Sequence, residues 1–216
     1  MSGATPTGST GRPGRAVRIG LTGPIGCGKS TVAHWLGEEP GVVVIDADDE
    51  ARAVLAPDTS ELAAVYARFG ESLRGADGSL DRAALGRIVF ADPVALGDLE
   101  AIVHPAVRPR ILTAIERAEG DGARAVVVEA IKLVEGGLAE LCDEVWLVTC
   151  DPETQLTRLR ARGLDVADAA ARIAVQGDLA GRLRDQATAI LDTSGTVAAT
   201  RDDLARRLAT AISRRA

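Results

Sequence analysis

The residues with the clearest chemistry lie in one glycine-rich loop near the start of the chain. The loop reads Gly23-Pro24-Ile25-Gly26-Cys27-Gly28-Lys29-Ser30-Thr31 and matches the spacing GxxxxGK[ST]. Its glycines allow backbone N–H groups to approach a polyphosphate, and a following helix adds the positive end of its dipole. We expect Lys29 to bind the β- and γ-phosphates and Ser30 to offer its hydroxyl to Mg²⁺. The loop therefore predicts an ATP-binding site.

Acidic residues follow an apolar run that reads GVVVI. The acids are Asp46, Asp48 and Asp49. If the chain stays extended there, alternation places Asp46 and Asp48 on one side, at the end of a strand where ligands bind in α/β sheets. Asp48 is then predicted to orient an attacking hydroxyl and accept its proton, with Asp46 near the acceptor. The alternative is the capped start of a helix, which suits Asp49 well.

A second strand-end acid is Glu129, which closes the run RAVVVE. We expect it beside the phosphate loop, where an acid can hold the water shell of Mg²⁺. The alternative is a solvated acid at the end of a strand.

Two other classes of function compete with an ATP-dependent phosphotransferase, and the acceptor of the transfer is a further open question. A GTPase switch normally reads guanine with an Asn-Lys-x-Asp segment, and the chain contains no asparagine. A regulatory protein that binds nucleotide without transfer is opposed by the intact Lys29, Ser30 and Asp48. A different small-molecule or nucleoside kinase stays open on these residues alone.

The elements that position these residues alternate between strand and helix patterns. Short apolar runs occur at 16–22, 41–45, 124–129, 144–149 and, weakly, 188–191. Helical patterns occur at 29–37, 59–69, 81–90, 93–119, 152–162, 166–186 and 201–216. This alternation predicts an α/β fold with a doubly wound, parallel, five-stranded sheet.

The uneven spacing of the strands predicts two insertions. The stretch between the second and third strands is longer than one crossover helix needs, so we expect a helical acceptor-binding insertion at 58–120. An arginine-rich stretch at 152–187 is expected to form a lid. The nucleotide-binding core would comprise 16–57, 121–151 and 188–216, preceded by a disordered tail at 1–15 rich in Gly, Ser, Thr and Pro.

Composition limits the partners and the compartment. The net charge of −6 argues against a general nucleic-acid surface, and no apolar run is long enough to predict a membrane span. Cys27, Cys142 and Cys150 form no CxxC pair, which indicates a reducing, cytoplasmic compartment rather than a disulfide framework. At Cys27 a helix N-terminus could lower the thiol pKa, or the residue could simply fit a tight loop.

Five segments together resemble the dephospho-coenzyme A kinases, the last enzymes of coenzyme A synthesis. They are IGLTGPIGCGKSTVA, VVIDADDEAR, ADGSLDRAALGRIVFADPVALGDLEAIVHPAV, DPETQLTRLRARG and ARIAVQ. The third segment is the most diagnostic, because other small-molecule kinases share the phosphate loop but not this stretch.

The resemblance implies a reaction and roles for named residues. ATP would phosphorylate the ribose 3′-hydroxyl of dephospho-coenzyme A with Mg²⁺, and Asp48 would be the base. Arg158 and Arg162 would belong to a lid over ATP. Arg82 and His104 are expected to contact the acceptor, although surface exposure and simple packing are their alternatives. No membrane partner is expected, and the protein would be a monomer or a weak homo-oligomer.

Two segments depart from the family pattern. After the third strand the family reads (D/E)-x-P-L-L-x-E, whereas this chain has Ile131 and Lys132 in place of proline and leucine. We expect Lys132 to contact an acceptor phosphate or pair with a nearby acid, unless it merely extends into solvent. Thr193 replaces the asparagine of a D-N-x-G segment, so a preference for adenine over guanine rests on the resemblance alone.

Overall fold

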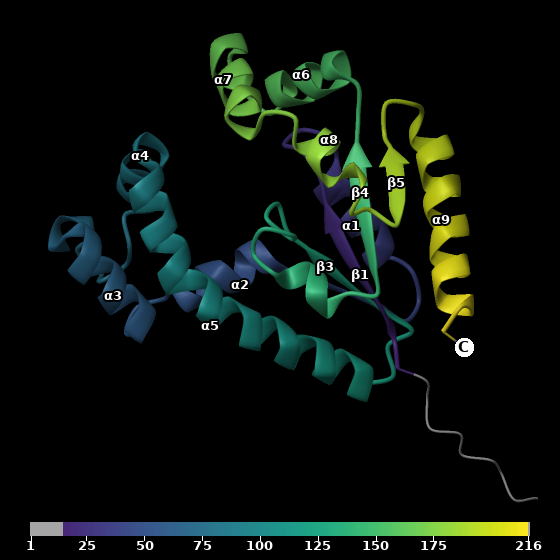
Figure 1. Ribbon diagram of the computed structural model, residues 1–216, viewed down its shortest axis with the longest axis horizontal. Helices are drawn as coiled ribbons and strands as arrows, with labels where there is room; N and C mark the ends of the chain where they lie inside the picture. The colour runs from purple at the N-terminus through teal and green to yellow at the C-terminus, as the bar shows by residue number, and fades with distance from the viewer. Residues whose placement is uncertain (1–14, 216) are drawn as a thin grey trace, which may run out of the picture.

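A computed structural model describes residues 15–215, apart from the side chain of Val175 (Figure 1). Five strands form one parallel sheet in the order β2-β3-β1-β4-β5. Their bounds are β1 Val17–Thr22, β2 Val42–Asp46, β3 Ala125–Glu129, β4 Glu144–Thr149 and β5 Ala189–Asp192. The predicted doubly wound, five-stranded parallel sheet is confirmed. Of the expected tail at 1–15, all but Arg15 lies outside the described residues.

Nine α-helices occur among the described residues. They are α1 Lys29–Gly37, α2 Ala47–Val54, α3 Ser60–Phe69, α4 Arg82–Ala91, α5 Pro93–Gly120, α6 Pro152–Ala161, α7 Val166–Gln176, α8 Leu179–Arg184 and α9 Val197–Ser213. None of these helices is long and apolar enough to cross a membrane.

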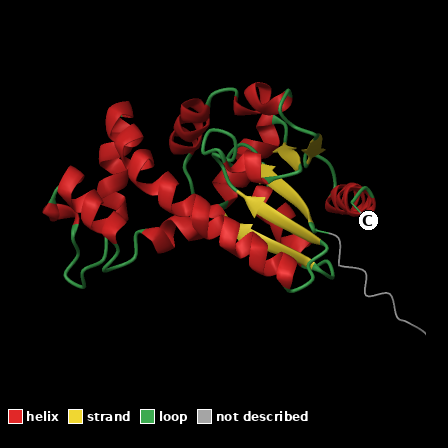
Figure 2. Ribbon diagram, turned by 60° about the horizontal axis from the view of Figure 1, so that its bottom comes forward, coloured by secondary structure: helices red, strands yellow, loops and turns green. Residues whose placement is uncertain are grey.

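The sheet is covered on both faces because alternate strand residues point in opposite directions. On β3, Val127 packs with Val32 of α1 and Leu204 of α9. The neighbouring Val128 packs with Ile111 of α5 in a second cluster. Figure 2 shows the strands enclosed by helices in this way. The strands are continuously apolar, as predicted from the sequence, because their side chains are buried on both faces of the sheet.

Three helix predictions need correction. Residues 47–54 form α2, which the sequence pattern did not predict. The helix expected over 166–186 is broken into α7 and α8, because Gly177 has a positive φ of 56° that ends the first helix. The last helix begins at Val197, four residues before the expected start at 201, with the Thr196 hydroxyl capping it.

The expected insertion forms a helical arm that projects from one edge of the sheet (Figures 1 and 2). In the arm, Leu62 and Val65 of α3 and Leu85 of α4 belong to the same buried cluster as Ile115 of α5 and Val126 of β3. The long helix α5 therefore serves both the arm and the sheet. The boundaries 58–120 and 152–187 for the insertion and lid stay predictions.

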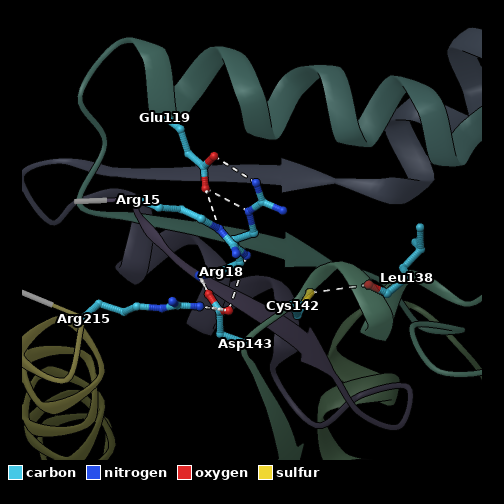
Figure 3. A network of polar contacts seen from close by, with 7 residues as sticks. All are labelled: Arg15, Arg18, Glu119, Leu138, Cys142, Asp143 and Arg215. Atoms are coloured by element: carbon cyan, nitrogen blue, oxygen red, sulfur yellow. Dashed lines mark hydrogen bonds and ion pairs between the residues drawn. The ribbon is translucent and has the colours of Figure 1, made fainter. Parts of the chain in front are cut away.

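A network of hydrogen bonds and ion pairs joins β1, the end of α5 and the residue before β4 at the end of the sheet opposite the phosphate loop (Figure 3). Arg18 of β1 donates from Nε and Nη2 to the two carboxylate oxygens of Glu119 on α5, at 2.8 and 2.9 Å. The Arg18 amide donates to Asp143 at 2.9 Å, and Arg215 after α9 also pairs with Asp143. Contact with Arg18, chiefly its hydrogen bonds, lowers the pKa of Glu119.

Replacing Glu119 with glutamine should lower the free energy of unfolding by about 1–3 kcal/mol, since a bidentate, largely buried ion pair loses its charge. The pKa of Glu119 is depressed in the fold, so its contribution is complete above the ordinary carboxyl pKa. That contribution disappears as the pH falls through the depressed value. Urea unfolding at neutral and acid pH measures this, with the exposed Glu116→Gln as control. Equal stability of both variants at neutral pH would contradict the expectation.

Candidate active site

The phosphate loop connects β1 to α1 and needs glycine at its first position. A Cβ on Gly23 would lie 2.2 Å from the carbonyl oxygen of Val148 on the neighbouring strand. Gly28 adopts a left-handed conformation, with φ at 86°, directly before α1 begins at Lys29. The backbone therefore passes close to β4 and turns at once into a helix, the arrangement that presents amides to a phosphate.

One carboxylate organises the two polar side chains at the start of α1. Oε1 of Glu129 accepts hydrogen bonds from Lys29 Nζ at 3.0 Å and from Ser30 Oγ at 2.9 Å. Glu129 reaches them because β3 lies beside β1, with Glu129 opposite Leu21. The residue is only 7% exposed. The expected proximity of Glu129 to the phosphate loop is thus observed, whereas its role toward a metal stays a prediction.

Asp46 is the extended last residue of β2, whereas Asp48 already lies in helix α2. Oδ1 of Asp46 caps α2, accepting from the amides of Asp48 at 2.8 Å and Asp49 at 3.3 Å. The alternation argument was therefore wrong, because the chain turns into a helix as soon as β2 ends. The cap uses an oxygen of Asp46 that was expected near the acceptor, and it places Asp48 in the first helical turn.

Asp48 nevertheless shares its surroundings with the phosphate loop. Partial burial raises the pKa of its carboxyl, the charge of Asp46 raises it further, and the cation of Lys29 opposes the shift. By its accessible surface Asp48 as a whole is exposed to solvent. A carboxylate whose pKa is raised is a stronger base than an ordinary one, which is the property that the predicted role of Asp48 requires.

The helices after β4 contact the phosphate loop through two glutamines. Gln155 of α6 donates to the carbonyl of Ile25 at 2.7 Å, and the Ile25 amide donates to Gln176 of α7 at 2.8 Å. Sequence reasoning missed both side chains, because a glutamine in an amphipathic helix gives no local signal of its partner. Helices from the region of the expected lid are thus attached to the phosphate loop.

Arg158 and Arg162, the two lid arginines predicted to act on ATP, occupy different environments. Arg158 donates to the hydroxyl of Thr193 at 2.8 Å and to its carbonyl at 2.7 Å. It also lies close to Gly28, where an added Cβ would stand 3.3 Å from its Nη1. Arg162 caps the end of α6 and is exposed. Only Arg158 is therefore held against the phosphate loop in this structure.

The other residues expected at the acceptor lie on α4, on α5 and after β3. Lys132 forms an ion pair with Glu100 of α5, the nearby acid that the sequence left unidentified. His104 lies one turn further along α5, half-buried, against the chain segment that contains Lys132. Arg82 at the start of α4 is exposed and donates to the carbonyl of Arg52 at 3.1 Å. The structure brings His104 and Lys132 together but leaves Arg82 on a different helix.

A magnesium ion would find a hydroxyl ligand at Ser30 and, at Glu129, a carboxylate that can hold its water shell. Hydroxyl and carboxylate oxygens suit this hard cation, which commonly uses few protein ligands and takes the others from phosphates and water. Between residues 15 and 215, no group of three or more His, Cys, Asp or Glu side chains could hold a metal. The donor set therefore fits a metal brought in with a nucleotide.

Comparison with known proteins identifies the family. The family model for dephospho-CoA kinase matches residues 17–199. This chain belongs to the dephospho-CoA kinase family. It is similar to the dephospho-CoA kinase of Symbiobacterium thermophilum, with 48% identity over 85% of this chain and 76% of that protein. It is also similar to the enzyme of Streptomyces avermitilis, with 50% identity over 77% of this chain and 80% of that protein.

Solved structures agree with this family. A Thermus thermophilus structure titled TT1252 has a TM-score of 0.75 and 34% identity, covering 93% of this chain and 98% of that one. The dephospho-CoA kinase of Campylobacter jejuni has a TM-score of 0.66 and 28% identity, covering 89% and 95%. The arrangement of sheet, arm and lid helices is thus shared with a solved member of the family.

Thr193 departs from the dephospho-CoA kinase pattern and is an internal support of the phosphate loop. Its hydroxyl lies 2.8 Å from the Cys27 carbonyl and 3.1 Å from the Thr149 carbonyl, and it accepts from Arg158. Because a hydroxyl has one proton, it donates to one carbonyl at a time. Thr193 is 5% exposed, so these partners replace water. Threonine here connects the ends of β4 and β5 to the loop.

Thr193→Val should lower stability by about 1–2 kcal/mol, since the shape is kept while buried partners lose a hydrogen bond. A loosened loop should also raise the KM for ATP about fivefold, which corresponds to roughly 1 kcal/mol. Thermal unfolding and ATP titration measure the two effects. Thr210→Val is the control, because Thr210 is exposed and its hydroxyl donates only to the Arg206 carbonyl within its own helix α9. Equal ATP KM values in both variants would contradict the expectation.

Proposed function

We propose that this protein transfers the γ-phosphate of ATP to the ribose 3′-hydroxyl of dephospho-coenzyme A, giving coenzyme A and ADP. The observation that carries the proposal is the shared carboxylate of Glu129, bonded to Lys29 and Ser30 in a chain whose family match spans 17–199. A cytoplasmic location fits its acidic charge and unpaired cysteines.

The phosphate loop and α1 bind the triphosphate. Backbone amides of the loop, the start of α1 and the Lys29 ammonium supply positive potential to its oxygens. Ser30 would bind Mg²⁺ with its hydroxyl and Glu129 would hold the water shell of the ion, which supplies charge that neutralises phosphate oxygens. Glu129 keeps Lys29 and Ser30 in place before the nucleotide arrives, so less reorganisation accompanies binding.

Asp48 acts on the acceptor hydroxyl from the opposite side. Its carboxylate accepts a hydrogen bond from the 3′-hydroxyl, aims the oxygen at the phosphorus, and takes the proton as the new bond forms. The cap made by Asp46 fixes the first turn of α2. This backbone restraint limits where the Asp48 carboxylate can lie.

The lid neutralises charge on the transferred group. Arginine has five N–H donors, and two contacts of Arg158 go to Thr193, so further donors can meet phosphate oxygens. Arg162 is exposed at the end of α6. It would therefore reach the phosphate oxygens only when the lid closes. Closure would also exclude water and limit ATP hydrolysis.

Asp48→Asn should lower kcat by roughly two decades or more, because an amide cannot take the proton from the acceptor hydroxyl. ATP binding should stay near normal. In the unchanged enzyme, kcat should fall as the pH drops through the raised pKa of Asp48, since the protonated carboxyl is no base. That acid limb should be absent from the variant. Steady-state rates across pH test this, with the neighbouring exposed Asp49→Asn as control. Near-normal kcat in Asp48→Asn would remove this residue from the mechanism.

A panel of acceptors separates this reaction from other functions. Purified protein with Mg-ATP should release ADP with dephospho-coenzyme A, and not with common nucleosides or without acceptor. Release with a nucleoside would indicate a different small-molecule kinase. Equal release without acceptor would indicate an ATPase, and binding of ATP without release would indicate a regulatory protein.

Lys132 tests the acceptor side of the site. Lys132→Ala should raise the acceptor KM about tenfold and the ATP KM much less, as expected for the loss of one charge-assisted hydrogen bond to a phosphate. Glu100→Gln removes the partner but keeps the cation, so it should not raise the acceptor KM. An unchanged acceptor KM in Lys132→Ala, or equal increases in both variants, would show that Lys132 does not bind the acceptor and serves only in the ion pair with Glu100.

A further inference from the structure

Two cysteines meet where the phosphate loop passes the start of the lid. Cys27 lies within the loop after β1, and Cys150 directly follows β4. Because β1 and β4 are parallel neighbours, their carboxyl ends lie side by side (Figure 1). The Sγ atoms of the two residues are 2.7 Å apart, although they are separated by more than half of the chain.

The pair borders a small cavity. The cavity measures about 120 Å³ and is lined by both cysteines together with Pro24, Thr149, Gln176 and Gly177, among others. Space of this size holds several water-sized molecules. Cys27 itself is only 2% exposed, so a small reagent can reach the sulfurs more readily than a protein can.

The two thiols differ in character. The Cys150 thiol donates to Cys27, which lowers the pKa of Cys27 despite the opposing effect of burial, and the cation of Arg158 lowers it further. The same interaction, with burial, raises the pKa of Cys150. The lowered pKa favours Cys27 as the nucleophile of the pair, with Cys150 as the neighbour that donates to it.

We propose that Cys27 and Cys150 are a redox-active pair that a small hydroperoxide converts reversibly into a disulfide. The Cys27 thiolate attacks one peroxide oxygen, breaking the O–O bond and giving a sulfenic acid and, with hydrogen peroxide, hydroxide. The Cys150 sulfur then attacks the Cys27 sulfur and displaces water. Overall, two thiols are oxidised and one peroxide is reduced to two waters. A dithiol reverses the step by exchange.

Little movement is needed to form the bond. A disulfide has an S–S length of about 2.05 Å, so the sulfurs must approach by well under 1 Å from 2.7 Å. The new bond would join the phosphate loop to the residue before Asp151, which caps the first lid helix α6. The loop and the start of the lid could then no longer adjust independently. On the proposed function, this restraint lowers the rate of phosphate transfer.

The third cysteine provides an internal control. Burial raises the pKa of Cys142 to about 12, and its thiol contacts the Leu138 carbonyl beside the charged network of Figure 3. A protonated thiol of this kind reacts slowly with peroxide. Cys142 should therefore stay reduced while the other two cysteines react.

Mass analysis tests the bond without reference to activity. Purified full-length protein is treated with hydrogen peroxide, alkylated and digested without reductant. We expect one disulfide-linked peptide pair containing Cys27 and Cys150 in the unchanged protein and in Cys142→Ala, with Cys142 alkylated in the former. Neither Cys27→Ala nor Cys150→Ser should give that pair. Absence of the pair from the unchanged protein, or pairing through Cys142, would overturn the proposal.

Activity tests the consequence. Before oxidation, Cys150→Ser and Cys142→Ala should match the unchanged enzyme. After peroxide, the unchanged enzyme and Cys142→Ala should lose about tenfold or more in kcat/KM, since sub-ångström displacement of a phosphate site is costly, and dithiothreitol should restore the loss. Cys150→Ser should lack this reversible loss. An equal reversible loss in Cys150→Ser, or full activity of the disulfide form, would refute the effect on turnover. If no phosphotransfer is seen before oxidation, the proposed function fails while the mass result still stands.

Discussion

The candidate active site depends on the buried carboxylate of Glu129, which needs hydrogen-bond partners and a nearby cation. Glu129 is almost inaccessible to water, and a charge in that position is costly unless it is paired and hydrogen-bonded. Lys29 and Ser30 meet this requirement with a single oxygen of Glu129. The strand order makes the contact possible, because β3 lies between β1, which leads to the loop, and β2, which leads to Asp48. The residues proposed to bind the phosphate donor and the acceptor are therefore grouped around the end of one central strand.

The phosphate loop is held from outside as well as by its own glycines. Gln155 and Gln176 bond both polar groups of the Ile25 backbone, and Thr193 holds the carbonyl of Cys27. These contacts come from the lid and from the end of β5, so movement of either element changes the restraint on the loop. This gives a physical route by which lid position and nucleotide binding can influence each other.

Much of the fold could be predicted from the sequence, since five continuously apolar runs specify buried parallel strands and the loop spelling is strongly constrained. The presence of helix α2 could not be predicted with the same certainty. The segment Asp46-Ala47-Asp48 is compatible both with an extended strand and with the start of a helix, and only the structure shows that the backbone turns into a helix there. Partners distant in sequence were also out of reach. Glu100 for Lys132, Thr193 for Arg158 and Cys150 for Cys27 are pairs that the topology creates and no local pattern marks.

The arm and the sheet share one apolar cluster, and this has a consequence for the acceptor side. Because Ile111 and Ile115 of α5 pack on the sheet while the first half of α5 packs in the arm, α5 fixes where Glu100 and His104 stand relative to the strand ends. A rigid helix that spans both parts is a better support for a site than a loop would be. Lid and arm therefore differ in design. The helices of the expected lid reach the phosphate loop through Gln155 and Gln176, and α8 packs on Leu147 of β4 in a small separate apolar cluster, whereas the arm is continuous with the apolar cluster that covers β3.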